Sequence, residues 1–139
     1  MLEPTSHDLC WHRAACHCGA VVVEVAAPAE IEAVECNCSI CRQTGFLHLI
    51  VPVARFRMVS GREALSTYRF NTGIAQHYFC AHCGGRPFYV PRSNPDGFSV
   101  NVRCIDRTTV RGVTIKCFDG DDWERNAGAL SHLSREEPA

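Results

Sequence analysis

The sequence predicts a mainly β fold in a single domain, built from short antiparallel strands with little helix. Its 139 residues are enough for one hydrophobic core and short for two. Runs of β-branched and aromatic residues recur along the chain, and glycine or proline separates each run from the next. No stretch keeps a helical hydrophobic period for long, and neither a repeat nor a linker is visible. Together these observations are typical of a small β-rich domain.

The individual elements follow from local patterns, in chain order. We expect residues 1–14 to form an irregular N-terminal segment, because their composition is mixed. The β-branched run AVVVEV predicts the first strand, and a break at Pro28 precedes the second. Residues 39–44 are long enough for one helical turn, and residues 129–136 for a frayed one within a C-terminal tail at 125–139. The central domain is expected at 15–124, with strands at 20–25, 31–36, 46–51, 64–70, 76–79, 87–90, 98–105 and 113–118.

The charge balance and the N-terminal sequence exclude two classes of partner. The chain has 14 Lys and Arg residues against 15 Asp and Glu residues, whereas proteins that bind nucleic-acid phosphates carry a basic excess. No stretch approaches the ~18 apolar residues of a membrane span. Residues 1–13 lack the basic start, the apolar run and the cleavage site of a secretory signal. We therefore expect a cytoplasmic protein with reduced thiols and with no nucleic-acid or membrane partner.

Cysteine is far more frequent than in an average domain. Ten of the 139 residues are cysteine, a frequency typical of disulfide scaffolds and metal proteins. Seven of them lie in tight clusters with C-x-C or C-x-x-C spacing. A disulfide within such a cluster would close a small, strained ring, whereas a tetrahedral zinc ion accepts neighbouring sulfurs at ~2.3 Å. The spacing therefore favours zinc sites over disulfides.

Counting the clustered sulfurs divides them between two zinc ions. Two clusters that are distant in the sequence together supply four thiolates, which complete a structural site that would hold the fold together. The remaining cluster supplies three thiolates and leaves a coordination position open for water or substrate. We predict two Zn²⁺ per chain, a structural ion on Cys16, Cys18, Cys80 and Cys83, and a second, catalytic ion on Cys36, Cys38 and Cys41.

Other assignments stay open at this point. A fourth side chain, from His48, His77 or Cys104, could close the second site and make it purely structural. The C-x-x-C pair of that cluster could also act in redox chemistry, which would leave its first cysteine without a role. The remaining residues of these types are expected to be packed or surface thiols, at Cys10 and Cys117, and surface imidazoles, at His7, His12 and His132.

Three segments of the chain resemble one known family. They are CHCGAV at 16–21, ECNCSICR at 35–42 and HYFCAHCG at 77–84. These segments resemble the glutathione-dependent formaldehyde-activating enzyme family, whose domain also occurs in centromere protein V. The resemblance extends from about residue 15 to 123, with FDG at 118–120 as a supporting segment. It implies a β-tent fold with two zinc sites, divided as the count of sulfurs divides them.

The resemblance also implies a reaction. Family members are carbon–sulfur lyases that combine glutathione and formaldehyde reversibly to S-hydroxymethylglutathione. A small thiol would enter the open position of the second zinc and attack a small carbonyl compound as its thiolate. His77 or His48 would protonate the new alkoxide or donate a hydrogen bond to a sulfur, and we favour the second role. Arg42 could hold a glutathione carboxylate, although a solvated surface arginine is the simpler interpretation.

Rival functions come from other zinc proteins. Arg103 and Cys104 superficially resemble the catalytic pair of zinc-containing methionine sulfoxide reductases, but that function would leave the second cysteine cluster without a role. A zinc deaminase needs H-x-E, and no histidine of this chain is followed two positions later by glutamate. A non-enzymatic, zinc-stabilised binding module is the third alternative.

Overall fold

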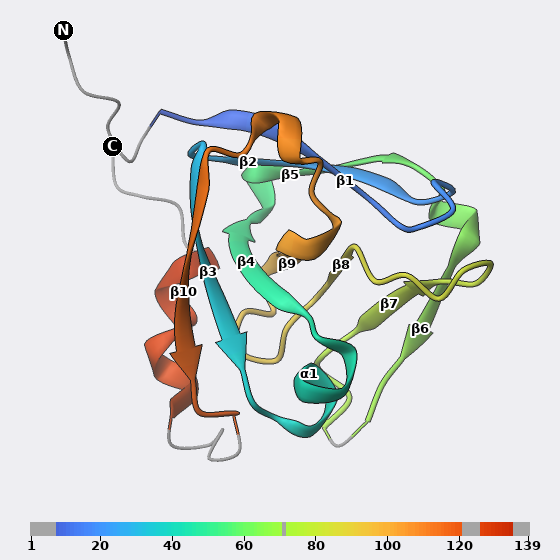
Figure 1. Cartoon of the computed structure of the whole chain (residues 1–139). Helices are drawn as coiled ribbons and strands as arrows, with labels where there is room; N and C mark the ends of the chain where they lie inside the picture. The colour runs from blue at the N-terminus through green and yellow to red at the C-terminus, as the bar shows by residue number, and fades with distance from the viewer. Residues whose placement is uncertain (1–7, 71, 121–125, 135–139) are drawn as a thin grey trace, which may run out of the picture.

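Three small β-sheets surround one hydrophobic core (Figure 1). This computed structural model describes residues 8–70, 72–120 and 126–134. The three-stranded sheet has the order β1-β2-β5, the five-stranded sheet the order β10-β3-β4-β9-β8, and β6 pairs with β7. The prediction of a mainly β fold with little helix is confirmed. The strands are β1 (Cys10–Ala15), β2 (Val22–Ala27), β3 (Glu30–Cys36), β4 (Leu47–Pro52), β5 (Phe56–Ser60), β6 (Leu65–Tyr68), β7 (His77–Cys80), β8 (Phe88–Tyr89), β9 (Gly97–Asn101) and β10 (Gly112–Phe118).

The helical pieces are short. The α-helix α1 (Ser39–Thr44) is a single turn and a half, and it ends at Gly45 in the left-handed conformation. The 3₁₀ turns are η1 (Val53–Arg55), η2 (Arg62–Ala64), η3 (Val102–Cys104), η4 (Arg107–Thr109), η6 (Ala127–Ala129) and η7 (Ser131–Ser134). None of the described helices is long and apolar enough to cross a membrane.

Strand β4 lies at the centre of the five-stranded sheet and is buried on both faces. Leu47, Leu49 and Val51 belong to the main core. Because side chains alternate along a strand, His48 and Ile50 point to the opposite face, where η7 packs on β4. His48 is therefore held in the middle of the molecule by the strand on which it sits.

One strand pair departs from the expected antiparallel arrangement. Strand β10 pairs with β3 in parallel, in a register that runs from Gly112 opposite Glu30 to Phe118 opposite Cys36. Parallel neighbours need a crossover connection, and η3 and η4 carry the chain from β9 to the far edge of the sheet. This pairing brings the end of β10 beside Cys36.

The N-terminal segment is not irregular as far as residue 14, so that prediction is wrong for its second half. Residues 10–15 form β1, which pairs with β2 from Cys10 opposite Ala27 to Ala15 opposite Val22. The hairpin closes over residues 16–21, so the Cys16 cluster forms its turn. The mixed composition of β1 hid the strand, because only its inward-facing side chains are buried.

His12 lies in this strand and is fully buried, so its prediction as a surface group is also wrong. Its Nε2 lies 3.1 Å from the carbonyl oxygens of both Ala27 and Pro28. Carbonyls only accept hydrogen bonds, so Nε2 carries the proton, and Nδ1 lies 2.7 Å from the Thr109 hydroxyl. His12 thus ties β1 to η4. His7 lies outside the described residues, and His132 is exposed as expected.

Two further differences concern strand boundaries. The strand expected at 98–105 ends at Asn101, because its side chain accepts the Arg103 N–H at 3.1 Å and starts η3. Strand β5 has no counterpart among the expected strands. In its sequence FRMVS, Phe56 and Met58 pack against the core, whereas Val59 is exposed.

Residues 130–134 dock on the rest of the fold. Asn94 is fully buried, and its Nδ2 donates to the Leu130 carbonyl at 2.8 Å and to the Ser134 hydroxyl at 2.9 Å. The helical turn expected at 129–136 is split between η6 and η7, and residues 135 and 136 lie outside the described residues.

Candidate metal centres and the adjoining cavities

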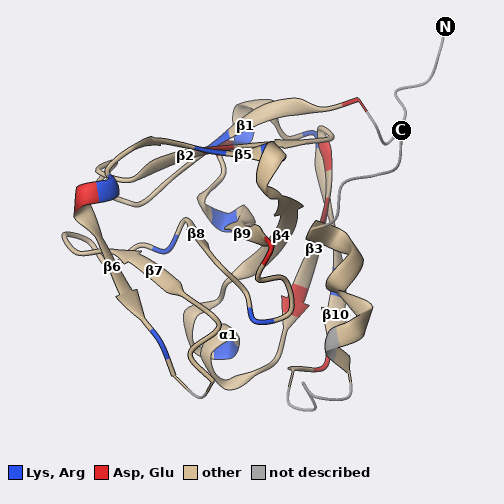
Figure 2. Ribbon diagram, turned by 180° about the vertical axis from the view of Figure 1, so that it is seen from behind, with Lys and Arg blue, Asp and Glu red and all other residues tan. Residues whose placement is uncertain are grey.

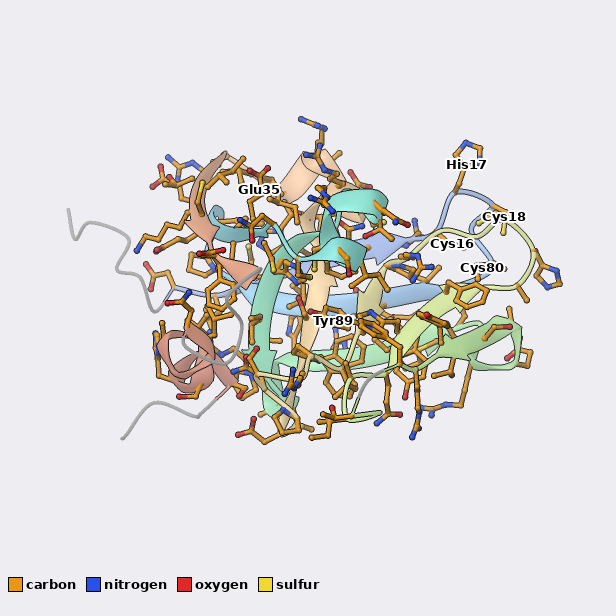
Figure 3. The ribbon with its side chains drawn as sticks, turned by 90° about the horizontal axis from the view of Figure 1, so that it is seen from below. Cys16, His17, Cys18, Glu35, Cys80 and Tyr89 are labelled. Carbon is orange, nitrogen blue, oxygen red and sulfur yellow. The ribbon has the colours of Figure 1, made fainter. Side chains whose placement is uncertain are left out.

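Four cysteines from two distant segments meet at one end of the molecule. The sulfurs of Cys16, Cys18, Cys80 and Cys83 all lie within 4.8 Å of one another, and Figure 3 shows the first three together at the β1–β2 turn and the end of β7. Cys18 Sγ lies 3.7 Å from both Cys16 Sγ and Cys80 Sγ. None of the ten cysteines forms a disulfide. The structure therefore brings together the four residues predicted to hold the structural ion.

The backbone around this cluster is arranged for thiolate sulfur. The Val21 N–H donates to Cys16 Sγ at 3.2 Å, and the Gly85 N–H to Cys83 Sγ at 3.4 Å. Backbone hydrogen bonds, from Cys18 first and then from Gly85, lower the pKa of Cys83 to about 6. Gly84 takes a positive φ of 76° in the turn that aims the sulfurs inward. Two of the four cysteines, Cys16 and Cys80, are buried, so a bound ion would link the β1–β2 hairpin to β7.

The other three clustered cysteines meet where β3 passes into α1. Cys36 ends β3, Cys38 is the N-cap of α1, and Cys41 lies within the helix and is buried. Their sulfurs lie within 4.8 Å of one another. The structure thus also brings together the three residues predicted for the second ion.

This three-cysteine site is closed on one side by the end of β10. The Asn37 side-chain oxygen accepts the Gly120 N–H at 2.6 Å, and its Nδ2 donates to Asp119 at 3.3 Å. A Cβ built on Gly120 would lie 2.3 Å from Cys36 Sγ and 2.9 Å from Cys38 Cβ. Only glycine fits at this position, because a side chain there would displace the sulfur.

The pKa shifts of the three thiols indicate that a bound cation would stabilise the site. Hydrogen bonding with Cys36 lowers the pKa of Cys38 and raises that of Cys41, and hydrogen bonding with Cys38 raises the pKa of Cys36. One thiol therefore ionises readily, whereas the other two resist ionisation beside it. A divalent cation would offset this repulsion. Closely spaced thiolates are the donors that zinc prefers, so the residues present fit that ion.

His48 contacts this cluster without joining it. Its Nε2 lies 3.2 Å from Cys41 Sγ, and its Nδ1 lies 3.0 Å from the hydroxyl of Ser99. Burial lowers the pKa of His48 to about 4, so the ring is neutral at pH 7. A neutral ring that accepts from Ser99 donates through Nε2 to sulfur. Among the described residues, no further His, Cys, Asp or Glu belongs to the group that surrounds Cys36, Cys38 and Cys41 within 4.8 Å.

His77 and Cys104, which the sequence also offered as a fourth ligand, lie outside the three-cysteine group. His77 is buried, and its ring stacks on that of Tyr89 with centroids 4.8 Å apart. Burial first, and then the charge of Arg86, lower the pKa of His77. Cys104 is half-buried and points its sulfur at the Arg86 carbonyl, 3.7 Å away. Burial, and then the charges of Cys16 and Cys83, raise the pKa of Cys104 to about 11.

An aromatic box adjoins Cys41. Tyr89 packs against Phe46, His48 and His77, with ring centroids 4.8 to 5.5 Å apart. A cavity of about 10 Å³ remains between these rings and Cys41, about the volume of one water molecule. Burial first, and then the charges of the three cysteines, raise the pKa of Tyr89 well above its usual value. The hydroxyl therefore stays protonated at neutral pH, within electrostatic reach of all three sulfurs.

A larger cavity of about 500 Å³ opens on another side of the three-cysteine site. We call it the thiol cavity. Its wall contains two of the three cysteines together with charged side chains from α1, η3 and the ends of β3 and β10. Its lining residues include Cys36, Cys41, Arg42, Arg103, Glu35 and Asp119.

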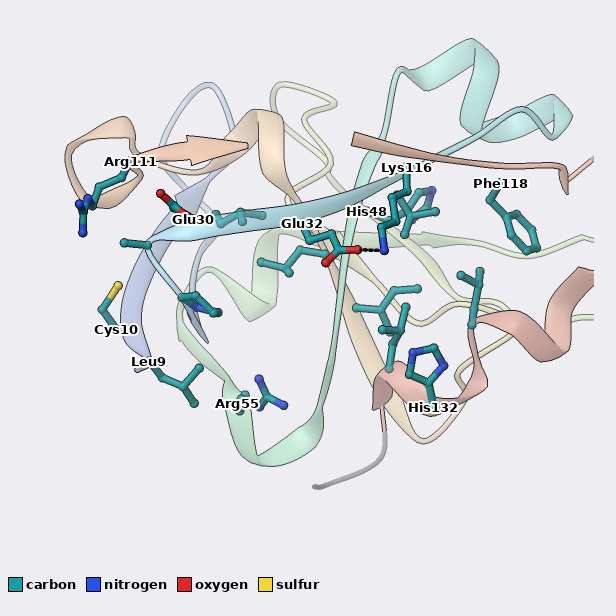
Figure 4. A pocket seen from close by; sticks show the side chains of 18 of the residues that line it. Leu9, Cys10, Glu30, Glu32, His48, Arg55, Arg111, Lys116, Phe118 and His132 are labelled. Atoms are coloured by element: carbon teal, nitrogen blue, oxygen red, sulfur yellow. Dashed lines mark ion pairs between the residues drawn. The ribbon is translucent and has the colours of Figure 1, made fainter. Parts of the chain in front are cut away.

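A third cavity lies on the opposite face of the five-stranded sheet. It has a volume of about 1250 Å³ and is lined by the sheet, by β10 and by η7. His48 forms part of its inner wall, and an ion pair between Lys116 and Glu32 crosses it (Figure 4). No clustered cysteine lines this cavity, so it is separate from the metal centres.

Four residues around the second site were not identified from the sequence as parts of it: Tyr89, Ser99, Arg103 and Gly120. Each reaches the site through tertiary pairing. Ser99, for example, is 51 residues from His48 in the chain, and Gly120 is 83 residues from Asn37. The segment FDG at 118–120 is the one available signal in the sequence, and by itself it carries no chemistry.

Comparison with known proteins finds a matching family and a similar solved structure. The sequence model of a family described as glutathione-dependent formaldehyde-activating enzyme matches residues 11–119. A crystal structure of a Rhodobacter sphaeroides protein is similar, with a TM-score of 0.62 and 35% sequence identity. The similarity covers 73% of this chain and 99% of that one.

Proposed function

Because the chain belongs to the glutathione-dependent formaldehyde-activating enzyme family, we propose that it is a zinc-dependent carbon–sulfur lyase that joins a thiol such as glutathione to formaldehyde or a similar small carbonyl compound. One observation carries this proposal. Three cysteine sulfurs gather at Cys36, Cys38 and Cys41, with no further His, Cys, Asp or Glu in that group among the described residues, and two of them line the thiol cavity. Such a site has room for an incoming sulfur.

The reaction is simple in its balance of atoms. The sulfur lone pair of the thiolate forms a bond to the carbonyl carbon, the carbonyl π pair moves to oxygen, and that oxygen takes up a proton. Zinc held by the three cysteines would supply the positive charge that favours the thiolate over the thiol. Cys16, Cys18, Cys80 and Cys83 would hold a second zinc ion with a structural role.

His48 supports the sulfurs rather than the substrate. Its Nε2 donates to Cys41 at 3.2 Å, while the Ser99 hydroxyl fixes the ring from the other side. Groups of this kind orient metal ligands and moderate the negative charge on them. This is the supporting role that the sequence favours.

We assign to Tyr89 the hydrogen bond to the carbonyl oxygen. Tyr89 lines the same small cavity as Cys41, and its raised pKa makes it a hydrogen-bond donor rather than an acid at neutral pH. A hydrogen bond from a buried hydroxyl to an oxygen that gains negative charge lowers the barrier most where water is excluded. His77 holds the Tyr89 ring by stacking, which assigns His77 a positioning role and moves the donor role to Tyr89.

The reductase alternative has little support. A catalytic cysteine needs a lowered pKa, whereas the pKa of Cys104 is raised to about 11. A redox C-x-x-C pair formed by Cys38 and Cys41 would leave Cys36 without a role beside them.

The test is the rate at which the zinc-loaded protein interconverts glutathione, formaldehyde and S-hydroxymethylglutathione, measured by NMR exchange because the uncatalysed reaction is itself fast. We expect acceleration by the wild type, loss of acceleration in Cys41→Ser, and full activity in Cys10→Ser, which alters a half-buried thiol outside both clusters. A wild-type protein that holds two zinc ions and leaves the exchange rate unchanged would disprove the lyase function.

A further inference from the structure

Strand β10 forms one edge of the five-stranded sheet, and its outer side has no partner strand among residues 8–70, 72–120 and 126–134. We propose that this edge is the interface of a homodimer, in which β10 pairs in antiparallel orientation with β10 of a second copy of the chain, around a two-fold axis at Ile115. The five-stranded sheets of the two copies would then form one continuous sheet.

Strand β10 lacks the features that usually protect an edge strand from pairing. Such strands are short, bulged or covered, or they carry proline or an outward charge. β10 has seven residues without proline, and its register with β3 is unbroken from Gly112 to Phe118. Its one charged residue, Lys116, pairs with Glu32 of β3 and so leans back over the sheet rather than out over the edge (Figure 4). The described residues therefore leave the outer N–H and C=O groups of β10 available to a further strand.

The other edges of the two larger sheets carry such protection. Strand β8, at the opposite edge of the five-stranded sheet, has two residues and lies between Pro87 and Pro91. Strand β5 has a register shift against β2, and the turn η2 that follows it carries charges of both signs (Figure 2). Strand β1 is partly covered, since Ala14 bridges to the residue after η3. In the described part of the chain, β10 is the one edge of these two sheets that is both long and unprotected.

One face of β10 is apolar and exposed. Side chains alternate along a strand, so Val113, Ile115 and Cys117 project from the same face. Val113 is 42% exposed, Ile115 is 49% exposed, and Cys117 is also exposed. A strand added at this edge would cover part of this apolar surface, which favours association.

A second copy of the chain is the occupant that this pattern fits. Ile115 is the midpoint of β10, so a two-fold axis there pairs all of the strand. It places Ile115 opposite its own copy and Val113 opposite Cys117, so apolar side chains meet on one face. On the other face it places Lys116 opposite Thr114, so like charges do not face each other. Moving the axis to a neighbouring residue shortens the paired segment, and an axis at Lys116 also brings two lysines opposite each other.

Pairing through β10 also limits the assembly to two copies. In a two-fold dimer both copies use the same surface, so the interface closes on itself. The outer edges of the joined sheet are then the two β8 strands, which are short and flanked by proline. The same edge therefore gives a closed dimer rather than an open chain of copies.

Sedimentation velocity of the zinc-loaded full chain, measured over a range of concentrations, tests the proposal. Reducing conditions exclude dimers linked through the exposed thiol of Cys117. The variants are Ile115→Lys, Ile115→Glu and an equimolar mixture of the two. Val59→Lys is the matched control, because Val59 is 53% exposed and lies on another edge strand, β5. Circular dichroism and zinc content establish that each variant is folded.

We expect a concentration-dependent dimer for the wild type and for Val59→Lys. The Kd of the dimer should rise about 10- to 100-fold in Ile115→Lys and in Ile115→Glu, because each copy loses a half-exposed isoleucine from the interface and like charges meet at the axis. Mixing these two variants should restore the dimer, since lysine then faces glutamate. The inference would be overturned by a wild type that stays monomeric at millimolar concentration, by a dimer that Ile115→Lys leaves intact or Val59→Lys weakens equally, or by a mixture that dissociates like each variant alone.

Discussion

Gly120 offers the sharpest test of how the second site is built, because it contacts the cysteines without being a ligand. In Gly120→Ala the new Cβ would begin 2.3 Å from Cys36 Sγ, and ordinary contact begins near 3.4 Å, so one of the two must move by about 1.1 Å. Zinc–sulfur distances tolerate about 0.2 Å. If the Cys36 sulfur is displaced by that much, it can no longer bind the metal in its present place.

Overpacking of this kind costs about 1–3 kcal/mol, which corresponds to roughly 5- to 150-fold in an equilibrium constant. We expect Gly120→Ala to remain folded, to keep the ion of the four-cysteine site, and to bind the second ion more weakly by that factor. The assay is competition with a chelator, read as zinc bound per chain, with thermal unfolding in parallel.

Gly112→Ala is the matched control, since nothing lies within 4 Å of a Cβ built there. The reasoning would be refuted if Gly120→Ala bound its second zinc within twofold of the wild type, or if the Gly112 variant lost as much.

The remaining predictions address the other parts of the fold and site. Cys80→Ser should fail to fold, because structural zinc binding contributes on the order of 10 kcal/mol and Cys80 is fully buried. Cys41→Ser should fold and hold one zinc ion. Equal damage to both variants, in thermal melts and in zinc analysis, would contradict the assignment of a structural and an open site. Tyr89→Phe should lower kcat about 100-fold and change KM less than threefold, and unchanged steady-state kinetics would remove Tyr89 from the mechanism. Asn94→Ala should lower the free energy of unfolding by about 1–3 kcal/mol, because the buried hydrogen bonds of Asn94 hold residues 130–134. Limited proteolysis near residue 130 should become faster. An unchanged proteolysis pattern with an unchanged Tm would count against the docking of this segment on Asn94.

The two cysteine groups that could hold metal ions could be predicted from the sequence, because each cysteine cluster is local. The C-x-C and C-x-x-C spacings place two or three sulfurs together whatever the rest of the chain does, and the structure brings all seven into two groups. The predicted strands around Val23, Leu49 and Val100 likewise depended on short runs of β-branched residues, and all three residues are buried in β2, β4 and β9.

The residues that shape the site could not be predicted in this way, since they arrive from distant parts of the chain. Gly120 reaches Cys36 only because β10 pairs with β3 in parallel, and no local pattern encodes that pairing. Arg103 reaches α1 because the Asn101 side chain ends β9 early and turns the chain into η3. The burial of His12 could not be predicted either, because its partners are two backbone carbonyls and one hydroxyl, and no local sequence pattern identifies such partners.

The absorption spectrum of the cobalt-substituted protein tests most directly whether the three-cysteine ion can receive an outside thiol. With cobalt at both sites, addition of glutathione should change the thiolate-to-cobalt charge-transfer band of the wild type and leave the spectrum of Cys41→Ser unchanged. A wild-type spectrum that stays constant up to millimolar glutathione would mean that the ion at Cys36, Cys38 and Cys41 is already fully coordinated, and an open site for an incoming thiol would be contradicted.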